Sequence, residues 1–171
     1  PRDYANPGAG DLHLALTRIP HSGSTRQGSL VVNPGGPGVA GADFASTVAM
    51  EIAPAVAREF DIVGFDPRGT GRSAPVTCLT DEETARWVDA DPTPDTAREV
   101  SALMRLARMI PAGCLQLSPD VAPVIGTENT VRDLDILRSA LGDPALNYLG
   151  FSYGTDLGAE YAERFPSTVE D

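Results

Sequence analysis

Residues 146–165 read LNYLGFSYGTDLGAEYAERF, a short apolar run followed by a helical pattern. Apolar residues dominate Leu146–Gly150, which is typical of a buried strand, and the spacing within Tyr153–Arg164 predicts a helix. The junction GFSYG matches the pattern Gly-x-Ser-x-Gly. In that pattern a sharp strand-to-helix turn exposes the serine hydroxyl, and the flanking glycines let strand and helix pass closely. We therefore predict that Ser152 is the nucleophile of an acyl-transfer reaction.

A second glycine-rich segment, NPGGPG at residues 33–38, ends the apolar run Ser29–Asn33. An acyl-transfer serine needs backbone N–H groups that stabilise the oxyanion, and one of them is expected from Tyr153, directly after the nucleophile. The other is expected from a loop after an earlier strand, and the loop 33–38 has this position. A phosphate-binding loop is the competing interpretation, but the Lys-Ser/Thr ending of that motif is absent.

The rest of the chain alternates between predicted strands and helices. Such alternation indicates an α/β fold with a largely parallel sheet flanked by helices. We expect one helix over Asp43–Glu59, with Asp43 as its N-cap and Pro54 bending its middle. Further strands are expected over residues 12–17 and 60–65, and further helices over residues 81–89, 96–110 and 127–141.

Composition excludes several classes of function. The 171 residues hold 13 basic and 24 acidic side chains, and the net charge of −11 argues against binding to nucleic acid or to anionic membranes. No run approaches the roughly 18 apolar residues of a membrane span, and no signal peptide is present. The first residue is Pro rather than Met, so we expect a processed or trimmed product. No ligand cluster or nucleotide fingerprint calls for a metal or a cofactor.

Four segments in matching order resemble the secreted tripeptidyl aminopeptidases and related proline iminopeptidases of the α/β-hydrolase superfamily. They are DYANP at 3–7, NPGGPG at 33–38, DIVGFDPRGTGRS at 61–73 and GFSYGT at 150–155. The resemblance implies that residues 1–171 are the N-terminal part of a single α/β-hydrolase domain. It implies that Ser152 is the nucleophile, that Gly36 and Tyr153 are the oxyanion donors, and that Gly35 is a further candidate donor.

The resemblance also bears on cysteines and on the segment after residue 65. Taken alone, Cys78 and Cys114 could be two buried thiols or, in a secreted protein, a disulfide. They look like the cysteine pair of the family, which implies the disulfide and a secreted, extracellular protein. Asp66 and Arg68 are expected to hold the loop beside Ser152 by hydrogen bonds rather than to act on a substrate.

A histidine base is missing from the expected place. Serine hydrolases of this fold carry the acid and the histidine after the nucleophile, yet no histidine follows Ser152. The two histidines present, His13 and His21, are expected to be ordinary strand and turn residues. We therefore expect the acid, the histidine and a cap to come from a C-terminal part of the same precursor or from a second chain. Alone, this chain is expected to be inactive, with an uncovered sheet edge.

The resemblance implies a serine exopeptidase that cleaves short peptides from free N-termini through an acyl-enzyme on Ser152. The same nucleophile would serve an esterase, lactonase or amidase acting on a small molecule. A third alternative is a non-catalytic remnant that only binds a partner.

Overall fold

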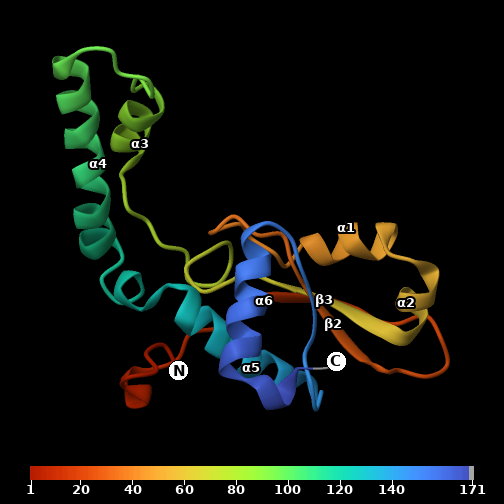
Figure 1. The fold of residues 1–171 in the computed structure, drawn as a ribbon. Helices are drawn as coiled ribbons and strands as arrows, with labels where there is room; N and C mark the ends of the chain where they lie inside the picture. Colours follow the sequence, from red (N-terminus) through yellow and green to blue (C-terminus); the bar gives the residue numbers. More distant parts are fainter. Residues whose placement is uncertain (170–171) are drawn as a thin grey trace. The chain divides into compact units, whose positions relative to one another are not determined.

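The structure is a computed structural model that describes residues 1–169 (Figure 1). The chain divides into two compact units. The first combines residues 1–75 with the chain from residue 125 onward, and the second is Val76–Val124. The first unit holds the sheet, both glycine-rich segments and Ser152.

Four strands form the sheet of the first unit: β1 (Leu16–Ile19), β2 (Gly28–Asn33), β3 (Phe60–Phe65) and β4 (Asn147–Gly150). Their order in space is β1-β3-β2-β4. The central strand β2 pairs in parallel with both β3 and β4, whereas β1 pairs antiparallel with β3. The predicted α/β class with a mostly parallel sheet is thus confirmed.

Neighbouring side chains of β2 point to opposite faces of the sheet, so both faces carry apolar residues. Helices cover both faces. Val31 belongs to a core shared with α5 (Thr127–Leu141) and α6 (Tyr153–Arg164). Val32, one residue later, packs in a core with α1 (Phe44–Glu51). The remaining elements of this unit are α2 and two 3-10 turns: α2 (Pro54–Glu59), η1 (Pro7–Ala9) and η3 (Pro166–Thr168).

The predicted single helix over 43–59 is wrong, because two helices, α1 and α2, occupy this stretch. Ala53 has an extended ψ of 133°, as the residue before a proline prefers. Pro54 then begins α2, where its missing N–H leaves no helical bond unmade. Asp43 does not cap α1 with its side chain. Its carboxylate instead pairs with Arg72 at 3.0 Å.

Two other boundaries also differ from expectation. The strand predicted over 12–17 begins only at Leu16, where pairing with β3 begins at Phe65. The helix predicted over 96–110 is α4 (Ala97–Leu117), which continues through Pro111. Proline usually ends a helix, and that tendency explains the predicted end at 110.

The second unit carries η2 (Ala122–Val124) and two helices, α3 (Asp81–Val88) and α4. Thr80 and Thr96 each form a complete capping box at the start of α3 and α4, which satisfies amide groups that a helix start leaves free. Cys78, before α3, forms a disulfide with Cys114 in α4, as the resemblance implied. None of the helices described is long and apolar enough to cross a membrane.

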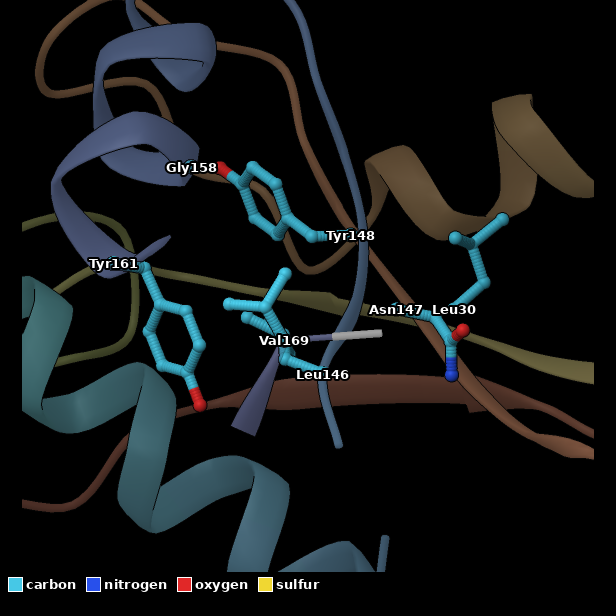
Figure 2. Close-up of a pocket in the computed structure, with 7 residues that line it drawn as sticks. All are labelled: Leu30, Leu146, Asn147, Tyr148, Gly158, Tyr161 and Val169. Atoms are coloured by element: carbon cyan, nitrogen blue, oxygen red, sulfur yellow. The ribbon is translucent and has the colours of Figure 1, made fainter. Parts of the chain in front are cut away.

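The outer side of β4 borders a hollow of about 450 Å³ (Figure 2). Tyr148 and Tyr161 line it, and the Val169 side chain lies beside Leu146. After η3 the chain returns to the side of β4, where the Leu146 amide donates to the Thr168 carbonyl at 2.7 Å. Val169 and Leu146 form a single parallel bridge. Among the described residues, parallel pairing on this side is limited to that single bridge, just before β4.

A buried carboxylate gathers the segments at the amino ends of β2 and β3. Asp61 is fully buried and accepts hydrogen bonds from Arg18, Arg26 and both the backbone and ring nitrogens of His21. Burial alone would raise the pKa of Asp61, but these donors outweigh burial and hold the pKa well below its usual range. His21 is therefore part of an ion-pair cluster rather than an isolated turn residue.

Replacing this carboxylate tests the cluster. Asp61→Asn should lower the free energy of unfolding at pH 7 by about 2 kcal/mol, because its cationic partners lose a buried counter-charge. A folded-state pKa below the unfolded value stabilises the fold above pH ~4, and this contribution is lost as the pH falls. The difference between wild type and Asp61→Asn should therefore shrink between pH 7 and pH 3 in urea unfolding. Asp43→Asn, which removes an exposed partner of Arg72, is the control and should leave the curve nearly unchanged. A difference that stays constant with pH would contradict the assignment.

Candidate active site

Ser152 sits on the turn between β4 and α6 with φ 52° and ψ −126°. A non-glycine residue rarely adopts a positive φ, and such strain collects at functional sites. The side chain is exposed, and within the described residues its hydroxyl forms no hydrogen bond. The backbone thus holds the hydroxyl out from the carboxyl end of the sheet, as a nucleophile requires.

Close packing of strand and helix explains the glycines on either side of this turn. A Cβ at Gly150 would collide with the Gly154 carbonyl, and a Cβ at Gly154 would lie 3.0 Å from the Asn33 oxygens. Tyr148 seals the turn from the side of β4 by donating its hydroxyl to the Gly154 carbonyl at 3.0 Å. The predicted reason for the glycine spacing is confirmed.

The loop 33–38 lies directly against this turn. Phe151 donates its amide to the Asn33 carbonyl at 3.0 Å, and Gly35 donates its amide to the Asn33 side-chain Oδ1 at 2.8 Å. Gly35 has a φ of 95°, and a Cβ there would lie 2.9 Å from the Ser152 Cβ and 3.0 Å from the Tyr153 nitrogen. The two segments that the sequence singled out are therefore in contact.

Some backbone amides of the loop 33–38 and of the Ser152 turn have no acceptor within the described residues. Neither the Gly36 nor the Tyr153 N–H donates a hydrogen bond there. The next two amides of the turn, from Gly154 and Thr155, are occupied by the carbonyls of Phe151 and Ser152. The Gly35 amide is occupied by the Asn33 side chain, whereas the Gly36 amide has no acceptor within the described residues.

Asp66 and Arg68 are both buried and form hydrogen bonds, though not with the turn that carries Ser152. Asp66 is buried and accepts the amides of Ala42 at 2.8 Å and Arg72 at 2.9 Å. Burial would raise the pKa of Asp66, but these hydrogen bonds outweigh burial and lower it. Arg68 has a fully buried guanidinium that forms two bonds with Asp133 on α5, at 2.6 and 2.7 Å.

The N-terminal segment closes the Arg68 cluster. Arg68 donates to the Arg2 carbonyl at 2.9 Å and lies 5.1 Å from the centre of the Tyr4 ring. Tyr4 donates its hydroxyl to Asp133 at 2.8 Å. Burial, and then this bond, raise the pKa of Tyr4 above its usual range. The DYANP motif thus packs on α5 and has a structural role.

Neither histidine lies near Ser152. His21 binds Asp61 at the amino end of β3, whereas Ser152 follows the carboxyl end of the parallel strand β4. His13 precedes β1, and two strands separate β1 from β4, roughly 14 Å at the usual strand spacing. The described residues therefore place Ser152 on the strand–helix turn with neither of the two histidines beside it.

A family model described as alpha/beta hydrolase fold matches residues 28–170. The chain belongs to this family. The solved proline iminopeptidase of Mycobacterium smegmatis agrees at the level of the fold, with a TM-score of 0.53 and 21% identity over 94% of this chain and 39% of that one. In the α/β-hydrolase family, the strand–serine–helix turn described above is where the nucleophile belongs.

Relatives of this α/β-hydrolase carry names of two kinds. The tripeptidyl aminopeptidase of Streptomyces coelicolor is 46% identical over 173 residues, covering 99% of this chain and 32% of the relative. Serine protease Hip1 of Mycobacterium tuberculosis is 41% identical over 172 residues, covering 99% of this chain and 33% of the relative. Carboxylesterase B of the same species is 42% identical over 144 residues, covering 82% and 27%. The chain thus spans about a third of the length of these curated relatives.

Sequence reasoning missed two buried polar residues of this region. Asp133 lies on the α5 face that also presents Val131 and Leu134 to the core, so a charged residue at a buried helical position was the available signal. Asn33 was assigned only as the start of a loop, and no sequence pattern marks its side chain as a ligand of the Gly35 amide.

The contact between the loop and the turn can be tested with two glycines of similar backbone. Gly35→Ala should lower the free energy of unfolding by about 3 kcal/mol, because a positive φ and a collision with the turn act together. Gly38→Ala is the matched control, since Gly38 also has a positive φ (85°) but its Cβ would meet no atom within 4 Å. We expect about 1 kcal/mol there. Equal losses in chemical unfolding would show that Gly35 does not pack on the turn.

Proposed function

We propose that this chain carries the nucleophile and the oxyanion hole of a serine exopeptidase that removes short peptides from free N-termini. The observation that carries the proposal is the positive φ of Ser152 on the strand–helix turn, beside two amides free of protein acceptors. The names of the two peptidase relatives supply the substrate class. Substrate length and residue preference are not part of the proposal.

In the proposed reaction the Ser152 Oγ attacks the scissile carbonyl while a histidine accepts its proton. The developing oxyanion accepts hydrogen bonds from the amides of Gly36 and Tyr153, and the start of α6 adds its favourable dipole. The histidine then protonates the leaving amine, and the peptide's acyl group remains on Ser152. Water releases that acyl group in the second half of the reaction.

The histidine and the acid come from outside the described residues, because His13 and His21 lie far from Ser152. We propose that a C-terminal part of the same precursor, or a second chain, supplies both together with a cap. The position of β4 at the edge of the sheet supports this proposal, since no described strand pairs with Asn147–Gly150 on its outer side. The hollow beside β4 in Figure 2 offers apolar surface to the same part.

Export from the cytoplasm is the corresponding proposal for localisation. The Cys78–Cys114 disulfide supports it, because such bonds persist mainly in oxidising compartments.

A second candidate function is an esterase acting on a small molecule. The name of the carboxylesterase relative favours it, and the same nucleophile and donors would serve it. The two candidate functions differ in the substrates that they predict. A peptidase of the proposed kind cleaves tripeptidyl anilides with a free N-terminus and spares their N-acetylated counterparts, whereas the esterase prefers short acyl esters to both.

The first experiment uses an active preparation that contains this chain with the part bearing the histidine. A fluorophosphonate should label this chain, and Ser152→Ala should abolish the label and lower kcat on the anilide by about 10⁴-fold or more. Ser101→Ala, an exposed serine on α4, is the control and should keep both label and rate. Ester hydrolysis without anilide hydrolysis would favour the esterase, and a label that survives Ser152→Ala would refute the nucleophile.

The need for an outside histidine is tested on the chain by itself. The isolated chain should hydrolyse neither anilide nor ester and should react slowly with the fluorophosphonate, because the serine hydroxyl keeps a high pKa without a base. Full turnover by the isolated chain would contradict the proposal.

A further inference from the structure

Asn33 links both halves of the candidate oxyanion hole. It is the last residue of β2 and is 1% exposed. Its main-chain carbonyl accepts the amide of Phe151, the residue before the nucleophile, while its side-chain Oδ1 accepts the amide of Gly35. One residue therefore sets the loop 33–38 against the turn that carries Ser152.

The other half of this carboxamide is unused. The Asn33 Nδ2 is buried and has no hydrogen-bond partner among the described residues. A buried donor without an acceptor lowers the stability of the folded protein. A carboxylate of the same shape would accept the Gly35 amide and has no N–H group to leave unpaired. Hydrogen bonding in the resting protein therefore does not explain why an amide, rather than an acid, stands here.

Electrostatics does explain it. A Cβ at Gly154 would lie 3.0 Å from the Asn33 Oδ1, so this oxygen lies at the base of the nucleophile turn. A negative charge on this buried oxygen would lie at the base of the turn that carries Ser152, where it would repel a developing oxyanion. A neutral carboxamide accepts the same amide without that repulsion.

We infer that Asn33 is a positioning residue of the oxyanion hole. Its Oδ1 fixes the Gly35 amide, and this hydrogen bond sets the orientation of the loop so that the Gly36 amide faces the oxyanion, while the carboxamide keeps the site uncharged. The inference rests on the proposed role of Ser152 as nucleophile. It adds a residue that touches neither substrate nor reacting atoms.

The test compares Asn33→Asp and Asn33→Leu with wild type in the complete, active enzyme. Rates on a tripeptidyl anilide and on an aryl ester are measured from pH 5 to pH 9. The rate of each variant is divided by the wild-type rate at the same pH, so that the effect of the histidine titration on the rate cancels. The charged and titratable side chains nearby, Arg68 and Tyr153 lining the same cavity and Tyr148 bonded to Gly154, are present in all variants.

We expect kcat of Asn33→Leu to fall about 100-fold at every pH, with KM changed less than threefold, as for a lost oxyanion donor. Asn33→Asp keeps the acceptor but adds a negative charge, so its kcat should also fall by about 100-fold at every pH at which the introduced carboxylate is ionised. Asn6→Asp adds the same charge at an exposed site and should leave kcat unchanged. A change in kcat below threefold in either Asn33 variant would overturn the inference.

A second measurement does not depend on turnover. Hydrogen exchange of the Gly35 amide should be at least tenfold faster in Asn33→Leu than in wild type, and Asn33→Asp should retain the wild-type rate. If wild type hydrolyses neither substrate, the proposed function fails. The hydrogen-exchange result still decides whether Asn33 positions the loop 33–38. An unchanged Gly35 exchange rate in Asn33→Leu would overturn this positioning role.

Discussion

The amide of Phe151 donates to the carbonyl of Asn33 across the carboxyl ends of β2 and β4, at 3.0 Å. This hydrogen bond continues the parallel pairing of the two strands one step beyond the sheet, and it forces two loops into contact. Only glycine at position 35 tolerates that approach, since any Cβ would meet the Ser152 Cβ at 2.9 Å. The position of Ser152 and the conformation of the loop 33–38 both depend on this contact.

Two buried charge clusters hold the sheet at its opposite ends. At the amino end, Asp61 collects Arg18, Arg26 and His21. At the carboxyl end, Arg68 joins α5 through Asp133. Neither cluster has a role in the proposed reaction. The second cluster restrains the loop after β3, which lines the same cavity as the loop 33–38. Buried ions that are fully paired resist displacement, because breaking one pair leaves an isolated charge in the interior.

The division of the proposed active site follows from chain order. In the α/β-hydrolase fold the nucleophile follows a central strand, while the acid and histidine follow later strands. The strand β4 lies at the edge of the sheet described for this chain, and Ser152 follows it directly. In the proposed function, the described residues would therefore supply the attacking atom and the oxyanion donors, and the base would come from elsewhere.

Local patterns in the sequence determined the α/β class, the four strands, the helices α5 and α6 and the nucleophile turn, because each depends on the periodicity of apolar residues or on glycine spacing. Boundaries at Pro54 and Pro111 were wrong, because a proline begins a helix in one case and lies inside a helix in the other. Tertiary structure alone decided that the Gly35 amide is occupied, so that it is not an oxyanion donor to propose. The Asn33 side chain occupies the Gly35 amide through a contact between residues two apart whose geometry depends on the distant Phe151 turn. Tertiary structure likewise placed His13 and His21 away from Ser152, since strand order and direction are properties of the assembled sheet and not of any local sequence.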